Sequence, residues 1–135
     1  MVVCAEMYVA KLEAEGLKYT TRELPDGSTI VSVMFNMVFT HAIFQSSDNG
    51  THVAFRTQLE SCPAEKTSDM LVVCNSLNMR YRWLKFYLDK DNDIMIEDDA
   101  IITTETAGDE CFELLIRTAG IIKEVKPFIL KAIYA

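Results

Sequence analysis

The sequence predicts an α+β fold in which one curved, antiparallel sheet packs with three helices. Apolar residues recur at helical spacing near the start, in the middle and at the end of the chain. The stretches between them show the two-residue alternation of strands. The predicted order is α-β-β-β-β-α-β-β-α. A length of 135 residues, half of them hydrophobic, fits a single domain spanning residues 1–135 with its own core.

The first two helices are predicted from apolar stripes and from helix start and stop signals. Met1–Glu15 is followed by Gly16, a typical helix stop. Its predicted buried stripe consists of Val3, Met7, Ala10 and Ala14. The second helix starts near Pro63, which suits a first helical turn because an N–H there would have no helical partner. Its predicted buried face consists of Met70, Leu71, Cys74 and Leu77.

The last helix, predicted over Gly108–Tyr134, is apolar on two faces. The first face consists of Leu115, Ala119, Ile122, Ile129 and Ile133, and the second of Leu114, Ile121, Val125 and Phe128. One sheet cannot comfortably cover both faces, so we expect Ile121, Val125 and Phe128 to pack against another helix or a second copy of the chain. A homodimer is therefore predicted. Pro127 should kink or restart this helix, and Gly120 should mark a close packing contact.

Six segments are predicted as strands: Leu17–Leu24, Thr29–Phe35, Met37–Ser46, Thr51–Glu60, Arg80–Leu88 and Ile94–Ile102. In the last pair, the apolar pattern favours the register that sets Leu88 opposite Ile94, because a one-residue slip would place an acidic residue opposite Phe86. Asp48-Asn49-Gly50 predicts a tight hairpin turn, which would set His41 opposite Gln58.

The strand predicted over Arg80–Leu88 offers the strongest candidate for a binding surface. Period-two alternation places Tyr81, Trp83 and Tyr87 on the face away from the core. Arg80 and Arg82 flank these rings. Aromatic and arginine side chains dominate binding hot spots, so these five residues are predicted to bind a partner. The alternative is that a helix covers the aromatic face.

Charge and composition restrict the kinds of partner. A net charge of -7 disfavours binding to nucleic acid and to anionic membranes, which both require clustered Lys and Arg. No apolar run approaches the roughly 20 residues that span a bilayer, and the N-terminus does not resemble an export signal. The four cysteines form neither a metal-binding pattern nor a disulfide framework. We therefore expect a cytoplasmic protein with reduced thiols, no metal and no cofactor.

Several polar groups have simpler explanations than catalysis. Asp89–Asp93 begins like a calcium loop, but Ile94 and Ala100 occupy the positions where that loop needs Gly and Glu, so an acidic turn is expected. His41 and His52 should lie too far apart to share a metal. Consecutive Glu97, Asp98 and Asp99 point to alternate faces and are interpreted as a solvated strand end.

Cys62 is the one candidate nucleophile, because it precedes a predicted helix whose dipole could lower its pKa. It motivates one functional hypothesis, a small cysteine-dependent hydrolase or transferase, but the favoured interpretation is that Cys62 is a small buried hydrophobic residue. We assign no catalytic residue.

The segment Cys62–Ile102, CPAEKTSDMLVVCNSLNMRYRWLKFYLDKDNDIMIEDDAII, resembles the YbjN family. The similar features are a helix started by Pro and ended by an N-x-x-N segment, here Asn75 to Asn78, then an aromatic strand, an acidic turn and a returning strand. The segment GLKYTTRELPDGSTIVSVMF and the helix that contains Pro127 are also similar to the family.

The resemblance implies the fold of the class I type III secretion chaperones, which are often dimeric, and a loose link to sensory-transduction regulation. It implies no known catalytic residue. The leading expectation is a non-enzymatic, protein-binding regulatory module. The alternative is a dedicated chaperone or adaptor for a polypeptide client.

Overall fold

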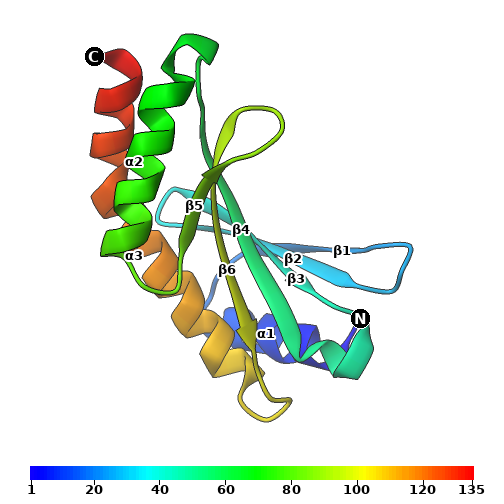
Figure 1. Ribbon diagram of the computed structural model, residues 1–135. Helices are drawn as coiled ribbons and strands as arrows, with labels where there is room; N and C mark the ends of the chain where they lie inside the picture. Colours follow the sequence, from blue (N-terminus) through cyan, green and yellow to red (C-terminus); the bar gives the residue numbers. More distant parts are fainter.

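A computed structural model describes residues 1–135, and its element order confirms the predicted fold class (Figure 1). The helices are α1 (Val3–Ala14), α2 (Thr67–Arg80) and α3 (Ala107–Tyr134). The strands are β1 (Tyr19–Glu23), β2 (Thr29–Phe35), β3 (Val38–Phe44), β4 (His52–Ser61), β5 (Lys85–Leu88) and β6 (Asp93–Ile101). Two short 3-10 turns, Ser47–Gly50 and Ala64–Lys66, complete the structure.

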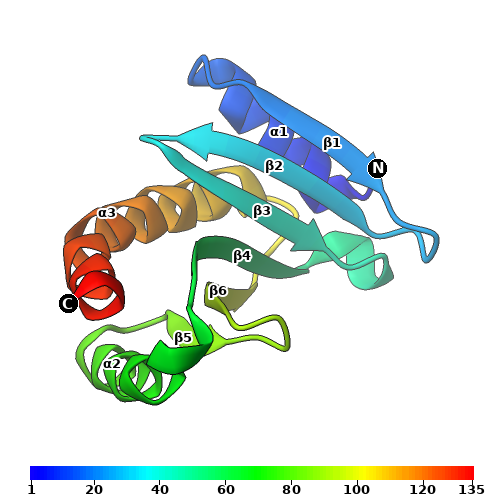
Figure 2. The same cartoon turned by 90° about the horizontal axis from the view of Figure 1, so that it is seen from above.

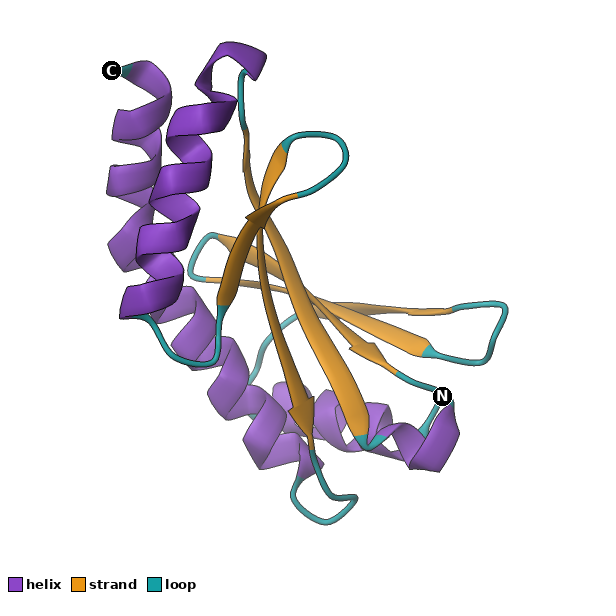
Figure 3. Ribbon diagram, viewed as in Figure 1, coloured by secondary structure: helices purple, strands orange, loops and turns teal.

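The six strands form one antiparallel sheet in the order β1-β2-β3-β4-β6-β5. The first four strands follow one another as a meander. Helix α2 then carries the chain past β4, so β5 becomes an edge strand and β6 returns between β4 and β5. Leu88 lies opposite Ile94 and Phe86 opposite Ile96, as predicted. The helices lie on one side of the strongly twisted sheet, and the other face is open (Figure 3).

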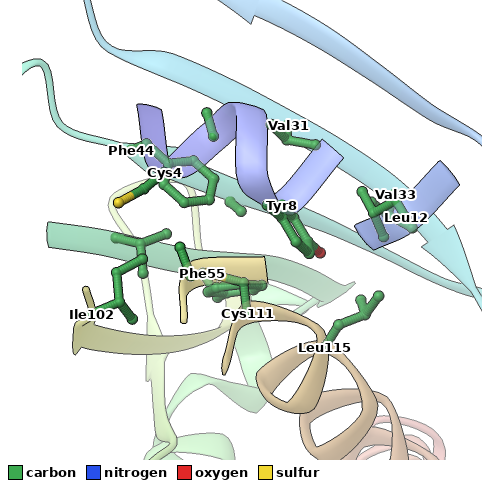
Figure 4. Close-up of a cluster of buried hydrophobic side chains, with 14 residues drawn as sticks. Cys4, Tyr8, Leu12, Val31, Val33, Phe44, Phe55, Ile102, Cys111 and Leu115 are labelled. Carbon is green, nitrogen blue, oxygen red and sulfur yellow. The ribbon is translucent and has the colours of Figure 1, made fainter. Parts of the chain in front are cut away.

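The first hydrophobic core lies between α1, strands β2–β4 and the start of α3 (Figure 4). Tyr8 is central, with its ring centroid 5.9 Å from the rings of both Phe44 and Phe55. The buried face of α1 consists of Cys4, Ala5, Tyr8 and Leu12. The predicted stripe on this helix is therefore wrong, and Val3 and Met7 are exposed. Helix α3 approaches α1 so closely that a Cβ on Gly108 would lie 2.9 Å from the Met7 carbonyl oxygen.

The second core lies between α2, β5, β6 and the C-terminal half of α3. The first apolar face predicted for α3 is fully buried. Met70, Cys74 and Leu77 are buried on α2 as predicted, whereas Leu71 is exposed. Helix α3 continues through Pro127 and curves, so that its two halves cover the two cores in turn (Figure 2).

The strand predicted over Arg80–Leu88 is shorter than expected, because α2 extends to Arg80 and β5 begins only at Lys85. The side chain of Asn78 pins the end of this helix to the strand. The Phe86 N–H donates to Asn78 Oδ1 (2.7 Å), and Asn78 Nδ2 donates to the Phe86 carbonyl oxygen (3.0 Å). The amide thus takes the place of a neighbouring strand and blocks the outer edge of β5.

The tight turn predicted at Asp48-Asn49-Gly50 is also wrong. These residues belong to a 3-10 turn in which Asp48 and Asn49 adopt left-handed backbone conformations, with φ of 51° and 59°. The longer connection shifts the strand register, so His41 lies opposite Arg56 and not opposite Gln58.

Candidate partner-binding surface

Trp83 is presented to solvent next to α3. Its side chain is 66% exposed, and its backbone has φ of 68°, in the left-handed region. The guanidinium of Arg117 lies 5.2 Å from the centre of the indole ring, and Arg117 Nε donates to Glu113 Oε1 at 2.9 Å. A left-handed conformation costs a bulky residue about 1–3 kcal/mol, and such strain gathers at functional sites. The connection between α2 and β5 therefore holds an aromatic ring outward at an energetic cost.

Two shallow grooves flank the indole ring. One, of about 310 Å³, runs between Trp83, Gly120 and Ile121. The other, of about 490 Å³, is bordered by Ile101, which is 80% exposed. The close contact predicted at Gly120 is absent, since no atom lies within 4 Å of the position its Cβ would take. We call the surface formed by Trp83, Ile101, Arg117, Gly120 and Ile121 the Trp83 ledge.

The other two aromatic residues of the predicted surface point elsewhere. Tyr81 is half-buried, with its ring 6.2 Å from that of Phe86 and the guanidinium of Arg80 5.6 Å from its centre. Tyr87 lies on the open face of the sheet, where its hydroxyl donates to Glu97 Oε2 at 2.8 Å. The predicted common face is therefore wrong, because the left-handed backbone at Trp83 interrupts the extended chain between α2 and β5. Arg82 is exposed beside Trp83.

The three residues predicted for helix packing or dimerisation also separate. Val125 is fully buried in the second core, and Ile121 is half-buried at the Trp83 ledge. Phe128 is 53% exposed and shares a shallow groove of about 290 Å³ with Val72 of α2, which is 67% exposed. We call Phe128 and Val72 the Phe128 patch.

Glu97 and Asp98 are both buried, so the prediction of a solvated strand end is wrong for them. They do point to opposite faces, as alternation requires. On the open face, Glu97 accepts the Tyr87 hydrogen bond and lies 3.4 Å from Arg56 Nε and 3.9 Å from Lys85 Nζ. This carboxylate ties β4, β5 and β6 together.

Asp98 lies on the helical side of the sheet, between the two cores, and is only 4% exposed. Its Oδ2 accepts a hydrogen bond from Thr118 of α3 (3.3 Å), while Oδ1 has no partner. Burial raises the pKa of this carboxyl to about 7, against the opposing effect of Thr118. The sequence contained a signal for the burial of Asp98, because period-two alternation places Asp98 on the same face of β6 as Ile94 and Ile96.

The acidic turn Asp89–Asp93 brings three carboxylates within 4.8 Å of one another. Asp89 Oδ1 accepts hydrogen bonds from the backbone N–H groups of Asp91 and Asp93, both at 2.9 Å. Asn92 Nδ2 donates to the Cys62 carbonyl oxygen and to Thr67 Oγ1. These contacts shape the turn and attach it to the start of α2.

Cys62 is buried, and its burial and the Glu65 carboxylate both raise the pKa of its thiol. The favoured interpretation of Cys62 as a small buried residue is confirmed. Helix α2 begins only at Thr67, five residues beyond the thiol. Burial is also the main cause that raises the pKa values of the Cys4, Cys74 and Cys111 thiols.

None of the three helices is both long and apolar enough to cross a membrane.

Comparison with solved structures shows the fold. E. coli YbjN, described as "a putative transcription regulator", matches with a TM-score of 0.61 at 14% identity, over 95% of this chain and 96% of that chain. The Yersinia pestis type III secretion chaperone SycH, solved with a stable fragment of YscM2, matches with a TM-score of 0.53 at 14% identity, over 88% and 98%. A chain of the ExsC–ExsE complex matches with a TM-score of 0.57 at 13% identity, over 93% and 96%.

Comparison with sequences is consistent with this result. No curated protein matches the chain significantly. The YbjN family model, described as "Putative bacterial sensory transduction regulator", matches residues 9–124. That match includes the second half of α1, the whole sheet, α2 and more than half of α3. The chain therefore belongs to the YbjN family.

Proposed function

We propose that this protein is a non-enzymatic regulatory module that acts by binding another polypeptide. The observation that carries the proposal is the Trp83 ledge. Tryptophan and arginine are the residues most enriched among binding hot spots, and here the two are stacked and exposed. The strained backbone at Trp83 holds the indole ring in solvent, and strain of this kind is typical of functional sites. The family's description as a sensory-transduction regulator supports a regulatory role.

Trp83 is the proposed anchor among the five residues predicted to bind a partner. Arg82 is exposed beside it, and Arg80 and Tyr81 lie at the end of α2 that leads to it. Tyr87 would contact a partner only if that partner also reached the open face of the sheet.

A second candidate function is that of a dedicated chaperone or adaptor for one polypeptide client. It is supported by the fold shared with SycH, which was solved with a YscM2 fragment, and with the ExsC–ExsE complex. A chaperone of this kind would hold its client in an extended, protease-sensitive form. A regulator that docks on a folded partner would leave the partner protease-resistant, so limited proteolysis of the complex separates the two functions.

We further propose that the protein is a cytoplasmic homodimer. Four free, buried cysteines suit a reducing compartment. The Phe128 patch is the apolar surface proposed for the dimer, since Phe128 is the exposed member of the predicted trio. Light scattering at micromolar concentration should show a dimer that Phe128→Asp converts to a monomer, whereas a monomeric wild-type chain would remove this part of the proposal.

The main test compares two exposed apolar residues in a pull-down from the source cell. Trp83→Ala should weaken retention of a stoichiometric polypeptide partner at least about tenfold, because hot-spot residues carry most of the binding energy. Met79→Ala is the matched control, since Met79 is exposed on α2 and lies outside the Trp83 ledge. Circular dichroism should show that both variants fold. Equal retention by wild type and Trp83→Ala would contradict the proposed site.

A further inference from the structure

Strands β3 and β4 pair along only half of their length. Their register runs from Phe44 opposite Val53 to His41 opposite Arg56, and the pairing stops at His41 and Arg56. Val38–Thr40 pairs only with β2, and the end of β4 from Thr57 onward pairs only with β6. Figure 2 shows the β2–β3 turn over the C-terminal half of α3, while β4 turns away toward α2. We call the gap between Val38–Thr40 and Thr57–Leu59 the β3–β4 split.

Local backbone features account for the split. The register between β4 and β6 shifts at Leu59, and a bulge of this kind bends a strand and increases its twist. On the other side, Asn36 and Met37 form a tight turn with φ of 49° and 67°, which keeps β3 against β2. Where the strands part, the hydroxyl oxygens of Thr40 and Thr57 lie 2.9 Å apart and close the end of the gap.

The split leaves backbone groups ready for a partner. Phe35 pairs with Val38 across the two-residue turn, so the next residue, Phe39, directs its N–H and C=O away from β2 and toward the gap. Pro127 has no N–H, so the Lys123 carbonyl oxygen lacks its helical donor. Unpaired strand edges are templates for an extended peptide.

The space between the strands is a groove of about 640 Å³ with α3 as its floor. This volume is typical of ligand sites. Its apolar lining includes Ile122 and Leu130 of α3, Phe39, and Met37, which is 89% exposed. The groove therefore suits a large apolar side chain.

The two charged residues that line the groove are both cations, Lys123 and Lys126. Neither forms an ion pair within the chain, although the protein as a whole has a net charge of -7. A local positive rim on an acidic protein favours an anionic ligand and repels basic ones.

We propose that the β3–β4 split binds an extended peptide segment with one large apolar side chain flanked by carboxylates. Its backbone pairs with the free edge at Phe39, its apolar side chain enters the groove, and its carboxylates meet Lys123 and Lys126. The site lies on the other flank of α3 from the Trp83 ledge, so it is a second docking site and does not depend on the first.

The test uses fluorescent octapeptides that alternate Glu with apolar residues around a central Phe. Saturable binding is expected at concentrations below about 1 mM. A counterpart with Lys in place of Glu should bind at least about tenfold more weakly, and so should a version whose backbone is N-methylated at alternate residues. When the acidic peptide binds, hydrogen exchange of the Phe39 amide should slow.

Two variants of α3 provide a matched pair. Lys126→Glu should weaken binding of the acidic peptide at least about tenfold, whereas Lys131→Glu makes the same charge change outside the groove and should leave binding unchanged. Trp83→Ala should also leave it unchanged, which separates this site from the Trp83 ledge.

Three results would overturn the proposal. The first is that the acidic peptide shows no saturable binding, and the second is that the basic counterpart binds equally well. The third is that the N-methylated peptide binds fully and that dodecanoate, added as a competitor, displaces it. The last result would identify the groove as a site for amphipathic anions and not for peptide strands.

Discussion

The two hydrophobic cores share α3 but differ in what surrounds them. The first is built around three aromatic rings, Tyr8, Phe44 and Phe55, and is enclosed by α1, well-paired strands and the start of α3. The second is mainly aliphatic, and Phe86 is its one fully buried aromatic ring. Around the second core lie the Phe128 patch, the β3–β4 split and Trp83 of the ledge.

The difference shows that the two halves of the fold serve different purposes. In the first half, stability comes from dense aromatic packing, from the fully paired strands β2 and β3 and from the segment over which β3 pairs with β4. In the second half, a strained connection, a bulge and a proline-bearing helix leave side chains and backbone groups exposed. Helix α3 joins the halves, with Thr118 and Asp98 at the boundary.

The largest expected effect is on the first core. Phe55→Ala should lower the free energy of unfolding by about 3–5 kcal/mol, because it leaves a cavity between Tyr8 and the sheet. Phe86→Ala should cost about 3 kcal/mol, at the lower end of that range, because β5 is an edge strand that can relax. Urea unfolding measures both changes. A larger cost at Phe86 would reverse the comparison.

The boundary between the cores should make stability depend on pH. The folded pKa of Asp98, about 7, is above the unfolded value, so the folded state holds a proton that the unfolded state releases. This contribution is fully present below about pH 4 and is lost as the pH rises to about 7, by at most about 4 kcal/mol.

Asp98→Asn should flatten that slope and stabilise the protein at pH 8, as measured by chemical unfolding at each pH. Asp99→Asn is the matched control. Asp99 is exposed on the opposite face, and its charge raises the pKa of Asp98 less than burial does, so this substitution should change the slope much less than Asp98→Asn. The prediction would be contradicted if the wild-type protein became more stable between pH 4 and 7 and Asp98→Asn abolished that increase.

The smallest expected effect concerns the contact between the end of α2 and the edge strand β5. Asn78→Ala removes both hydrogen bonds to the Phe86 backbone and should cost about 1–3 kcal/mol. Asn75→Ala, one helical turn earlier, should change stability by less than about 0.5 kcal/mol, because Asn75 makes only a long contact to the Met79 sulfur. Equal losses of stability at the two positions would show that the hydrogen bonds from the Asn78 side chain to the Phe86 backbone are dispensable.

Patterns that repeat over many residues were predicted correctly. The first apolar face of α3 extends over several turns, and its buried residues follow from that repeat. The register of β5 and β6 follows from the alternation of Phe86 and Leu88 with Ile94 and Ile96. The order of the elements follows from the same periodicities and from helix stop and start residues such as Gly16 and Pro63.

Short or ambiguous patterns failed. Helix α1 has apolar residues on nearly every side, so the stripe through Val3 and Met7 was as plausible as the true one through Cys4, Tyr8 and Leu12. The continuous strand predicted through Tyr81 and Trp83 failed because α2 extends to Arg80 and the backbone at Trp83 is left-handed. The hydrogen bonds between Asn78 and Phe86, eight positions apart, hold the end of α2 against β5.

The sequence by itself determined the fold class, the family and the buried face of α3, because each depends on many residues whose separate preferences agree. Only the tertiary structure decided the places where a binding function can lie. It turned Trp83 outward, buried Asp98 between two cores and opened β3 from β4. Each of these outcomes depends on how segments distant in the chain pack together. A local pattern, such as the alternation that places Asp98 with Ile94 and Ile96 on one face of β6, supplies only part of that information.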